Sequence, residues 1–521
     1  MPIPPLSSPP VFGRISAVNT GRATDASATR AEGEPYISKS KYLWGLQCPK
    51  LLWHAYHAKE LIPKPDAAQQ ALFDQGHDVG ALAKKLYPRG VEVGEGVLDL
   101  DETLRLTREA VKLRKPLFEA AFAAEGAYCR VDILNPVAKE VWDIIEVKST
   151  TSLKDVHLED LAFQAQVLAA AGLKIRASGL MHINPDFVRR GKINPKKFFV
   201  LEDLSLPVAD LSRIVEDKLG DMFKTIRLPA HPDIKIGSRC DDPYTCPLHD
   251  HCWSFLPEGS VTTLYRGTRK GFDLLAAGVT TLAEVPDDVP LTENQEIQRQ
   301  AARTGQPHVD GAALRAFLGQ IISPVSFLDF ETFGTAIPLF DGLRPYQQVP
   351  FQFSLHVVRA NGQPPQHFKF LADGDRDPRR DFMRRLREVL PAEGSVIAYN
   401  AGFELGRLNE CCEALPEFRS WLNTVEPRVL DLLLPFRGFR YYHPRQNGSA
   451  SMKAVLPALT GKGYEQLAIQ EGDTASREFL RVTFGEVPEA ERRRVRDQLE
   501  AYCGRDTEGM MWIVSALRRL V

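Results

Sequence analysis

Two carboxylates stand two positions apart inside an apolar stretch, residues 325–333, which reads V-S-F-L-D-F-E-T-F. Because alternate residues of a strand share a face, we expect Asp329 and Glu331 to point the same way. Two like charges among aromatic side chains are costly to bury unless a cation lies between them. Carboxylate oxygens are the ligands that Mg²⁺ and Mn²⁺ prefer, so the stretch predicts a divalent-cation site. The alternative is a sheet edge that leaves both acids in water.

Charged residues also gather on a predicted hairpin whose strands cover residues 126–134 and 141–149. Asp132 lies on the first strand, and Glu146 and Lys148 lie on the second, where alternation gives them the same face. Two acids can hold a divalent cation, and a nearby ammonium can stabilise the charge that develops on a phosphate. Metal-dependent hydrolysis of phosphodiester bonds uses this combination of groups.

A helix is predicted at 158–171, closed by Gly172, and a turn at 135–140 joins the two strands before it. Gln164 on this helix could position the nucleophile or a phosphate. An E-x-K pair in a strand is more often part of a solvated face. Here the flanks, V-D-I-L and I-I-E-V-K, are apolar, and unpaired charge in such strands would be expensive, which favours a buried site.

Length and composition describe an ordinary globular chain that contains more than one core. The 521 residues suggest two to four domains, and the net charge of −2 gives no overall attraction to nucleic acid. Any nucleic-acid binding must therefore come from local basic patches. No apolar run approaches the ~20 residues that span a bilayer, and the N-terminus lacks a secretion signal pattern, so we expect a cytoplasmic protein without a membrane partner. Eight cysteines in such a chain favour metal ligands or plain thiols over disulfides.

The pattern of elements predicts an α/β protein with two sheet-containing halves. Residues 1–34 are rich in Pro, Ser, Ala and Thr and predict a disordered tail. Residues 35–256 contain helices followed by the predicted hairpin, and residues 324–521 contain further strands and helices. Between these halves, residues 257–323 predict a helical connector.

Three motifs in the N-terminal half are R-V-D-I-L at 130–134, I-E-V-K at 145–148 and F-Q-A-Q at 163–166. They resemble those of the RecB-like PD-(D/E)xK nucleases. The resemblance implies a restriction-endonuclease-like core over residues 35–256. It also implies that Asp132 and Glu146 bind Mg²⁺ or Mn²⁺, and that Lys148 and Gln164 take part in catalysis.

Within that superfamily the chain is most similar to the branch that includes CRISPR-associated exonucleases, which carries one cysteine before the core and three after it. By this resemblance a [4Fe–4S] cluster is bound by Cys48, Cys240, Cys246 and Cys252. Four thiolates also suit zinc. The C-x5-C-x5-C spacing does not distinguish an iron–sulfur cluster from a zinc ion. His249 and His251 keep zinc open, and simple burial of three thiols is a further alternative.

One position departs from the branch's pattern. Its members often carry a metal-binding histidine four residues after a glycine in the helix before the strands. Here Gly76 is followed four residues later by Gly80, and His77 lies nearby at a different position. His77 is therefore an uncertain ligand and is consistent with a surface residue.

The C-terminal half carries further acids on separate predicted elements. Glu404 follows a strand-to-helix turn, N-A-G-F-E, and Asp431 lies in a short apolar run. Tyr502 and Asp506 are four apart in the last predicted helix and so share a face.

The motifs D-x-E, N-x-x-F-E and Y-x-x-x-D resemble those of DnaQ-like DEDD 3′–5′ exonucleases, which have a ribonuclease H-like mixed sheet with flanking helices. The resemblance implies metal binding by Asp329, Glu331, Glu404 and Asp506, and a water-positioning role for Tyr502. Glu404 departs from the pattern, because that family usually has Asp there, and the longer side chain puts the two-metal geometry in doubt. Asp431 is left as an uncertain ligand.

A RecB-like nuclease followed by a DEDD exonuclease-like half resembles a bacterial family known only as a domain of unknown function. The resemblance implies a nuclease that hydrolyses nucleic acid, with DNA favoured over RNA and 3′–5′ polarity in the C-terminal half. The alternative is a nucleic-acid-binding or structural protein with a degenerate exonuclease half and a purely structural cysteine site. Every motif retains its acids, and Glu404 is the one substitution, which favours the enzyme.

Overall fold

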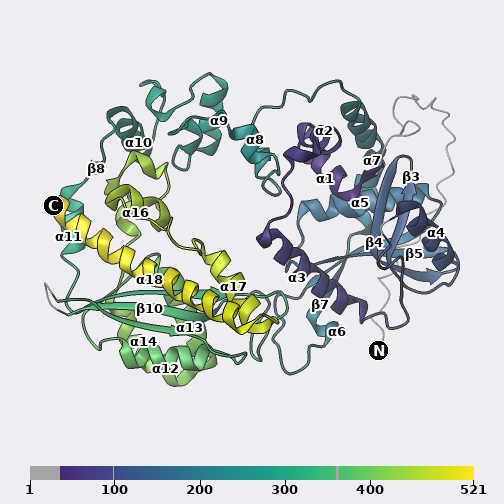
Figure 1. Ribbon diagram of the computed structural model, residues 1–521. Helices are drawn as coiled ribbons and strands as arrows, with labels where there is room; N and C mark the ends of the chain where they lie inside the picture. The colour runs from purple at the N-terminus through teal and green to yellow at the C-terminus, as the bar shows by residue number, and fades with distance from the viewer. Residues whose placement is uncertain (1–35, 98, 360–362) are drawn as a thin grey trace. The chain divides into compact units, whose positions relative to one another are not determined.

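The computed structural model describes residues 36–97, 99–359 and 363–521 (Figure 1). The tail predicted at residues 1–34 lies outside the described residues. Among the residues described, no helix is both long and apolar enough to cross a membrane.

The chain divides into two compact units. Unit 1 comprises residues 1–254 and 335–346, and unit 2 comprises residues 255–334 and 347–521. Residues 257–323, which the sequence predicted as a connector, therefore belong to unit 2. Residues 335–346, between the first two long strands of unit 2, belong to unit 1. Each unit combines helices with a sheet, which confirms the mixed α/β class (Figure 1).

Unit 1 is built on a mixed sheet in the order β2-β3-β4-β5-β6-β7, with β1 parallel to β4. Its strands are β1 (Ile37–Ser38), β2 (Val91–Glu92), β3 (Leu117–Ala124), β4 (Ala127–Ala138), β5 (Val141–Lys148), β6 (Lys174–Ile183) and β7 (Phe199–Asp203). Its helices are α1 (Lys39–Gln47), α2 (Pro49–His57), α3 (Ala67–Lys84), α4 (Leu100–Val111), α5 (Asp155–Ala170), α6 (Pro195–Phe198), α7 (Ser205–Ile226) and α8 (His249–Trp253).

The two faces of this sheet are covered by different helices. Ile144 of β5 belongs to the core shared with α5 and α7, whereas the next residue, Ile145, belongs to the core shared with α3. Alternation along β5 therefore places Glu146 and Lys148 on the α5 side, as the sequence predicts. The β4–β5 turn is shorter than expected, because β4 continues through Pro136 to Ala138. Proline is tolerated there because the strand pairing is irregular at that point.

Unit 2 is built on a mixed sheet in the order β11-β10-β9-β12-β13, in which β10 is antiparallel to both β9 and β11, and β12 is parallel to both β9 and β13. Its strands are β8 (His308–Val309), β9 (Val325–Phe333), β10 (Val349–Val358), β11 (Gln366–Leu371), β12 (Ser395–Ala398), β13 (Val429–Asp431) and β14 (Tyr441–Tyr442). Its helices are α9 (Thr268–Ala276), α10 (Glu293–Thr304), α11 (Gly311–Leu318), α12 (Arg379–Val389), α13 (Ala401–Ala414), α14 (Arg419–Val425), α15 (Leu434–Arg437), α16 (Met452–Thr460), α17 (Gly472–Phe484) and α18 (Glu489–Leu520).

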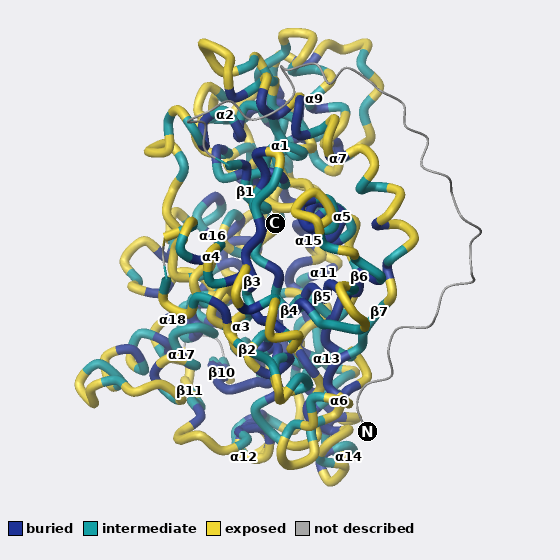
Figure 2. The backbone as a smooth tube through the Cα atoms, turned by 90° about the vertical axis from the view of Figure 1, so that its right-hand side faces the viewer, coloured by how far each residue is buried: buried dark blue, intermediate teal, exposed yellow. Residues whose placement is uncertain are grey.

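Helices cover both faces of this second sheet, and β10 is buried over most of its length (Figure 2). Leu328 and Phe330 of β9 pack in one core with residues of α12, α13 and α14. On the other face, Phe333 stacks on Phe479 of α17, with ring centroids 5.6 Å apart, and α18 crosses β9 and β10 (Figure 1). The odd residues of β9 therefore face α17 and α18, as the alternation predicts.

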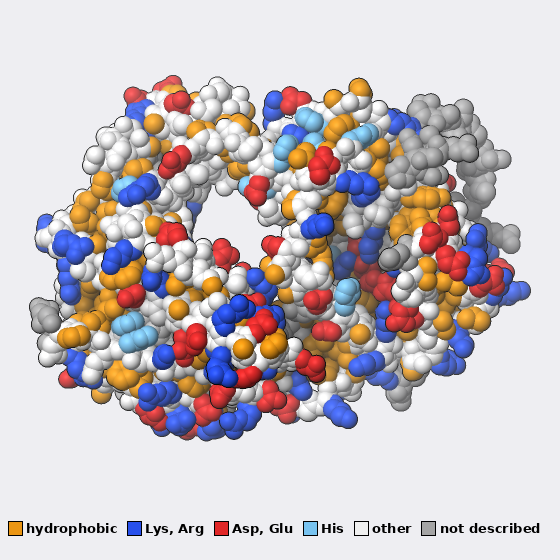
Figure 3. Space-filling view, in the orientation of Figure 1, with side chains coloured by type: hydrophobic (Ala, Val, Ile, Leu, Met, Phe, Trp, Pro, Cys, Tyr) orange, Lys and Arg blue, Asp and Glu red, His pale blue; other side chains and the backbone are white. Residues whose placement is uncertain are grey.

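The arginine-rich helix α12 displays blue and red side chains together on the surface (Figure 3). Arg380 pairs with Glu417, and Arg384 pairs with Asp381 and Glu388. Because these acids neutralise the arginines locally, the helix is not the uncompensated basic patch that phosphate binding needs.

Candidate active sites

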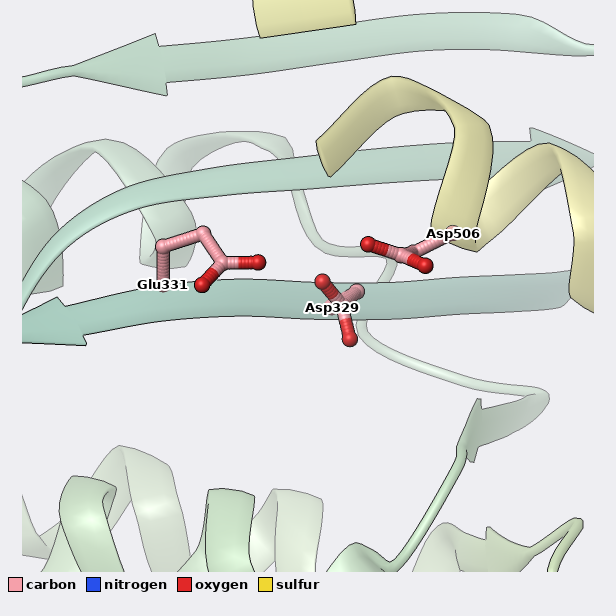
Figure 4. A group of neighbouring side chains, drawn as sticks. All are labelled: Asp329, Glu331 and Asp506. Atoms are coloured by element: carbon pink, nitrogen blue, oxygen red, sulfur yellow. The ribbon is translucent and has the colours of Figure 1, made fainter. Parts of the chain in front are cut away.

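The carboxylates of Asp329, Glu331 and Asp506 form a buried acidic centre in unit 2, which we call the C-terminal centre. Each offers an oxygen, and these oxygens lie within 4.8 Å of one another. Asp329 and Glu331 come from one face of β9, and Asp506 reaches them from α18 (Figure 4). Three carboxylate oxygens at this separation match the donor set of Mg²⁺ or Mn²⁺.

Burial makes the negative charge of the C-terminal centre expensive. Burial, with the charges of Glu331 and Glu404 beside it, raises the pKa of Asp329 well above its ordinary value. Burial and the charge of Asp506 raise the pKa of Glu331 to about 8, and burial with the charge of Asp329 raises the pKa of Asp506. Acids with raised pKa values lose their protons readily when a cation takes the place of those protons, so the donor set fits a hard divalent ion.

Glu404, a further predicted ligand, lies next to the centre. Glu404 is in the first turn of α13 and 5% exposed, and its buried Oε2 has no hydrogen-bond partner. Burial, with the charges of Asp431 and Glu331, raises the pKa of Glu404 to about 8. Glu404 is thus an acid aimed into the same region, although it is outside the set of oxygens within 4.8 Å.

Asp431 instead fixes the backbone. Its Oδ1 accepts hydrogen bonds from the N–H groups of Asn400 and Leu433, both at 2.9 Å. Asn400 begins α13 with a φ of 75°, a conformation that favours Asn or Gly. Asp431 therefore holds the turn that presents Glu404.

Tyr502 lies one helical turn before Asp506 on α18, is 4% exposed, and sits near the charges of Asp506 and Glu331. Sequence reasoning missed Tyr464, whose hydroxyl donates to Asp506 Oδ1 at 2.5 Å. It also missed Lys453, whose charge lowers the pKa values of Glu331 and Asp506. Neither residue belongs to a motif, and they reach the centre from the segment that precedes α17.

Gly472, the first residue of α17, shows how closely the start of that helix approaches the centre. A Cβ added at Gly472 would lie 3.4 Å from Glu331 Oε2 and 4.0 Å from the Tyr502 hydroxyl. A side chain there would therefore enter the centre.

A second buried cluster, which we call the N-terminal centre, lies in unit 1 around Glu146. Lys148 Nζ donates to Glu146 Oε1 at 2.6 Å, and Gln164 Nε2 donates to Glu146 Oε2 at 2.7 Å. Burial alone would raise the pKa of Glu146, but the charges of Lys148 and Lys39 outweigh burial and hold that pKa below its usual range. The structure thus brings together Glu146, Lys148 and Gln164.

Asp132 joins this centre where the β4–β5 ladder ends. The pairing of β4 with β5 ends at Ile133 and Ile145. The next two residues, Asp132 and Glu146, therefore lie opposite each other where the strands begin to separate. Asp132 Oδ2 accepts the N–H of Val147 at 2.8 Å, which replaces a ladder hydrogen bond. Burial and the charge of Glu146 raise the pKa of Asp132 to about 7.

Sequence reasoning missed two members of the N-terminal centre. Asp160 on α5 is 2% exposed and accepts hydrogen bonds from Lys148 at 2.7 Å and from Gln164 at 2.9 Å. Lys39, the first residue of α1, donates to Glu146 Oε1 at 2.9 Å. Asp160 precedes Gln164 by one helical turn, so the shared helix face was a signal for it. Lys39 lies 107 residues before Glu146, and no local pattern links them.

The four cysteines expected as cluster ligands lie in one group. Cys246 is buried, and Cys48, Cys240 and Cys252 pack against the same small core. All four thiols are free. Gln47 Nε2 donates to the carbonyls of Arg239 and Tyr244, at 3.0 and 2.7 Å, and so ties the two distant segments together.

The three histidines singled out from the sequence lie on helices α3 and α8 of unit 1. His77 is exposed on α3. His249 stacks on Trp253 with ring centroids 4.4 Å apart, and His251 lies edge-on to His54 at 5.7 Å.

Metal binding at the C-terminal centre is expected to strengthen as pH rises. In the metal-free protein Glu331 ionises near pH 8, whereas in the unfolded chain it ionises near its ordinary value of about 4.3. Its neutral form thus supports the fold at low pH, and this contribution is lost as pH rises from about 4.3 to about 8. Because Mn²⁺ must displace that proton and those of the neighbouring acids, its apparent affinity should rise at least ~10-fold from pH 6 to pH 7.

Isothermal titration of the metal-free protein with Mn²⁺ at several pH values measures this dependence. Glu331→Gln removes one of the displaced protons and should make this dependence shallower. An affinity that is equal at pH 6 and pH 7 in the unaltered protein would contradict the expectation.

Comparisons with known proteins concern parts of the chain. Residues 326–451 match the model of a family described as "Domain of unknown function (DUF2779)". The "Uncharacterized protein MG366" of Mycoplasma genitalium (strain ATCC 33530 / DSM 19775 / NCTC 10195 / G37) is 23% identical over 214 residues, which cover 37% of this chain and 32% of that protein. The chain thus matches about a third of that relative's length.

A solved structure, "Crystal structure of SSO0001", aligns with 39% of this chain and 90% of its own, at 16% identity and a TM-score of 0.19. That score is too low to support an argument about the fold. The match at residues 326–451 fits a domain-of-unknown-function family, and Asp329, Glu331 and Glu404 fall inside it, whereas Asp506 follows it.

Proposed function

We propose that this protein is a metal-dependent nuclease that hydrolyses phosphodiester bonds at two separate centres. The observation that carries the proposal is the C-terminal centre, where acids from β9 and α18 converge in a buried place that favours a cation. A purely structural cluster would be expected to pair these acids with arginine or lysine, since unpaired buried charge is destabilising. The retention of every motif acid supports an enzyme over a binding module.

At the C-terminal centre, Asp329, Glu331 and Asp506 would hold Mg²⁺ or Mn²⁺, with Glu404 placed to complete the set. The bound ion would polarise the phosphate and lower the pKa of an attacking water. Tyr464 fixes the orientation of the Asp506 carboxylate through its hydrogen bond. Tyr502 is placed to orient the attacking water. The mixed sheet with flanking helices agrees with the ribonuclease H-like architecture that the DEDD resemblance implies, and 3′–5′ exonuclease polarity follows from that resemblance.

At the N-terminal centre, Asp132 and Glu146 would share the metal ion. Lys148 lies against Glu146 and presents an ammonium that can stabilise negative charge developing on the phosphate. Gln164 and Asp160 hold Glu146 and Lys148 in place through their hydrogen bonds. This arrangement supports the restriction-endonuclease-like assignment of unit 1, and the preference for DNA follows from the resemblance to those nucleases.

The four-cysteine group is proposed to hold a [4Fe–4S] cluster that ties together the two ends of unit 1. Its support is the convergence of Cys48, Cys240, Cys246 and Cys252 on one small core. The cluster would replace the thiol protons, since burial raises the pKa of Cys246 to about 11 in the metal-free form.

Anaerobically purified protein should be brown and absorb near ~400 nm. Cys246→Ser should remove most of this absorbance and the bound iron, whereas Cys412→Ser, which alters a buried thiol of α13, should retain both. A colourless protein that contains one equivalent of zinc would show that the metal is zinc instead.

The proposed activity is tested with end-labelled single- and double-stranded DNA and RNA in Mg²⁺ or Mn²⁺. We expect shortening of DNA that stops when EDTA is added. If the protein binds the nucleic acids but cleaves none of them with either metal, the alternative of a binding or structural protein is correct.

A further inference from the structure

Lys39 stands outside every motif, yet it lies among the acids of the N-terminal centre. Its Nζ is 2.9 Å from Glu146 Oε1 and 3.5 Å from Asp160 Oδ1, and its side chain is 24% exposed. Burial works against the ammonium, but the charges of Glu146, Asp160 and Asp132 outweigh burial and raise the pKa of Lys39. Lys39 is therefore a charged lysine in contact with two acids and close to the third.

One carboxylate oxygen, Glu146 Oε1, accepts from two lysines. Lys148 occupies it at 2.6 Å and also bonds to Asp160 Oδ2 at 2.7 Å, so Lys148 is anchored at two points. Lys39 has its one short contact at Oε1 itself. The other oxygen, Oε2, receives the Gln164 amide.

A divalent ion shared by Asp132 and Glu146 must bind an oxygen of Glu146, and both of these oxygens already accept hydrogen bonds. Two cations at one oxygen repel strongly in a buried place, where the dielectric is low. Of the two lysines, Lys148 is held by a second short bond to Asp160, so Lys39 is the one that can leave. Lys39 is the first residue of α1, and its side chain is partly exposed to solvent.

We propose that Lys39 is a built-in counter-cation, which neutralises Glu146 and Asp160 while the N-terminal centre is empty and is displaced when a divalent metal ion binds. This inference rests on the proposed function of that centre. It assigns Lys39 control over metal affinity and leaves the phosphate-stabilising role to Lys148.

The test measures Mn²⁺ binding by calorimetry in protein whose C-terminal centre is removed by Asp329→Asn and Asp506→Asn. In this background, Lys39→Gln should tighten Mn²⁺ binding by at least ~10-fold, because the metal ion no longer competes with an ammonium. Lys41→Gln is the matched control, since Lys41 lies on the same helix with its ammonium 3.9 Å from the Tyr56 ring, and it should leave the affinity unchanged.

Thermal unfolding gives a second readout, which distinguishes a counter-cation from a lysine that only stabilises the fold. Lys39→Gln should lower the Tm of the metal-free protein and leave the Tm in saturating Mn²⁺ close to that of the parent. Equal losses of Tm with and without Mn²⁺ would overturn the inference.

Lys39→Arg keeps the charge and is the variant to use if Lys39→Gln does not fold. It should bind Mn²⁺ no more tightly than the parent, and tighter binding would overturn the inference.

The failures of the two proposals are distinguishable. If the parent binds Mn²⁺ and Lys39→Gln binds it equally or more weakly, the counter-cation role is wrong and the metal centre stands. If the parent binds no Mn²⁺ at this centre, the proposed metal function of unit 1 fails, and the role of Lys39 fails with it.

Discussion

Asp329→Asn is expected to reduce nucleotide release by the C-terminal centre by at least ~100-fold, beyond the 10–100-fold that loss of an outer-shell partner costs. Asparagine has nearly the same size but carries no negative charge with which to hold a metal ion. Because burial already favours the neutral form of Asp329, the substitution should leave the Tm of the metal-free protein unchanged or raise it. The measurement is release from a 3′-labelled single strand in Mg²⁺, with Lys148→Ala present so that only this centre acts.

Asp381→Asn is the matched control, because Asp381 lies in the exposed first turn of α12 and pairs with Arg384. It should retain full activity. If Asp329→Asn retained activity while losing the Mn²⁺-induced rise in Tm, the metal ion would be structural and the assignment of this centre as catalytic would be wrong.

Lys148→Ala is expected to lower DNA cleavage by the N-terminal centre by about 10²–10³-fold, as loss of a preorganised charge-stabilising group does. The measurement is made in the Asp329→Asn background. The substitution should also destabilise unit 1, because it removes one cation shared by Glu146 and Asp160. Removing one partner of a fully buried pair costs about 3–5 kcal/mol. Lys39 still contacts both acids, so we expect a smaller loss.

Lys174→Ala provides the comparison, since Lys174 is an exposed residue at the start of β6 in the same sheet. It should change neither cleavage nor Tm. Cleavage that survives in Lys148→Ala, with the fold shown intact by circular dichroism, would remove Lys148 from the catalytic set.

Local pattern was enough to predict the parts of the centres that depend on a single element. Alternation in β9 places Asp329 and Glu331 on one face, and helical spacing places Tyr502 beside Asp506 on α18. The same reasoning puts Glu146 and Lys148 together on β5. In each case the physical cause is the geometry of one strand or one helix, and sequence spacing encodes it directly.

Long-range partners could not be predicted in this way. Lys39 reaches Glu146 across 107 residues, and Tyr464 reaches Asp506 across 42. Such contacts depend on how separate elements pack, which no single-element period records. Asp431 stayed an uncertain ligand for a related reason, because a carboxylate that accepts two backbone N–H groups looks the same in sequence as one that binds a metal ion.

The most direct test of the central claim is the anomalous scattering of Mn²⁺ soaked into crystals of the protein. The account predicts a peak bonded to carboxylate oxygens of Asp329, Glu331 and Asp506 at ~2.1 Å, the distance typical of small divalent ions. The same soak of Asp329→Asn should show that peak lost or much reduced. An intact acidic pocket that holds no Mn²⁺ at saturating concentration and neutral pH would contradict the account.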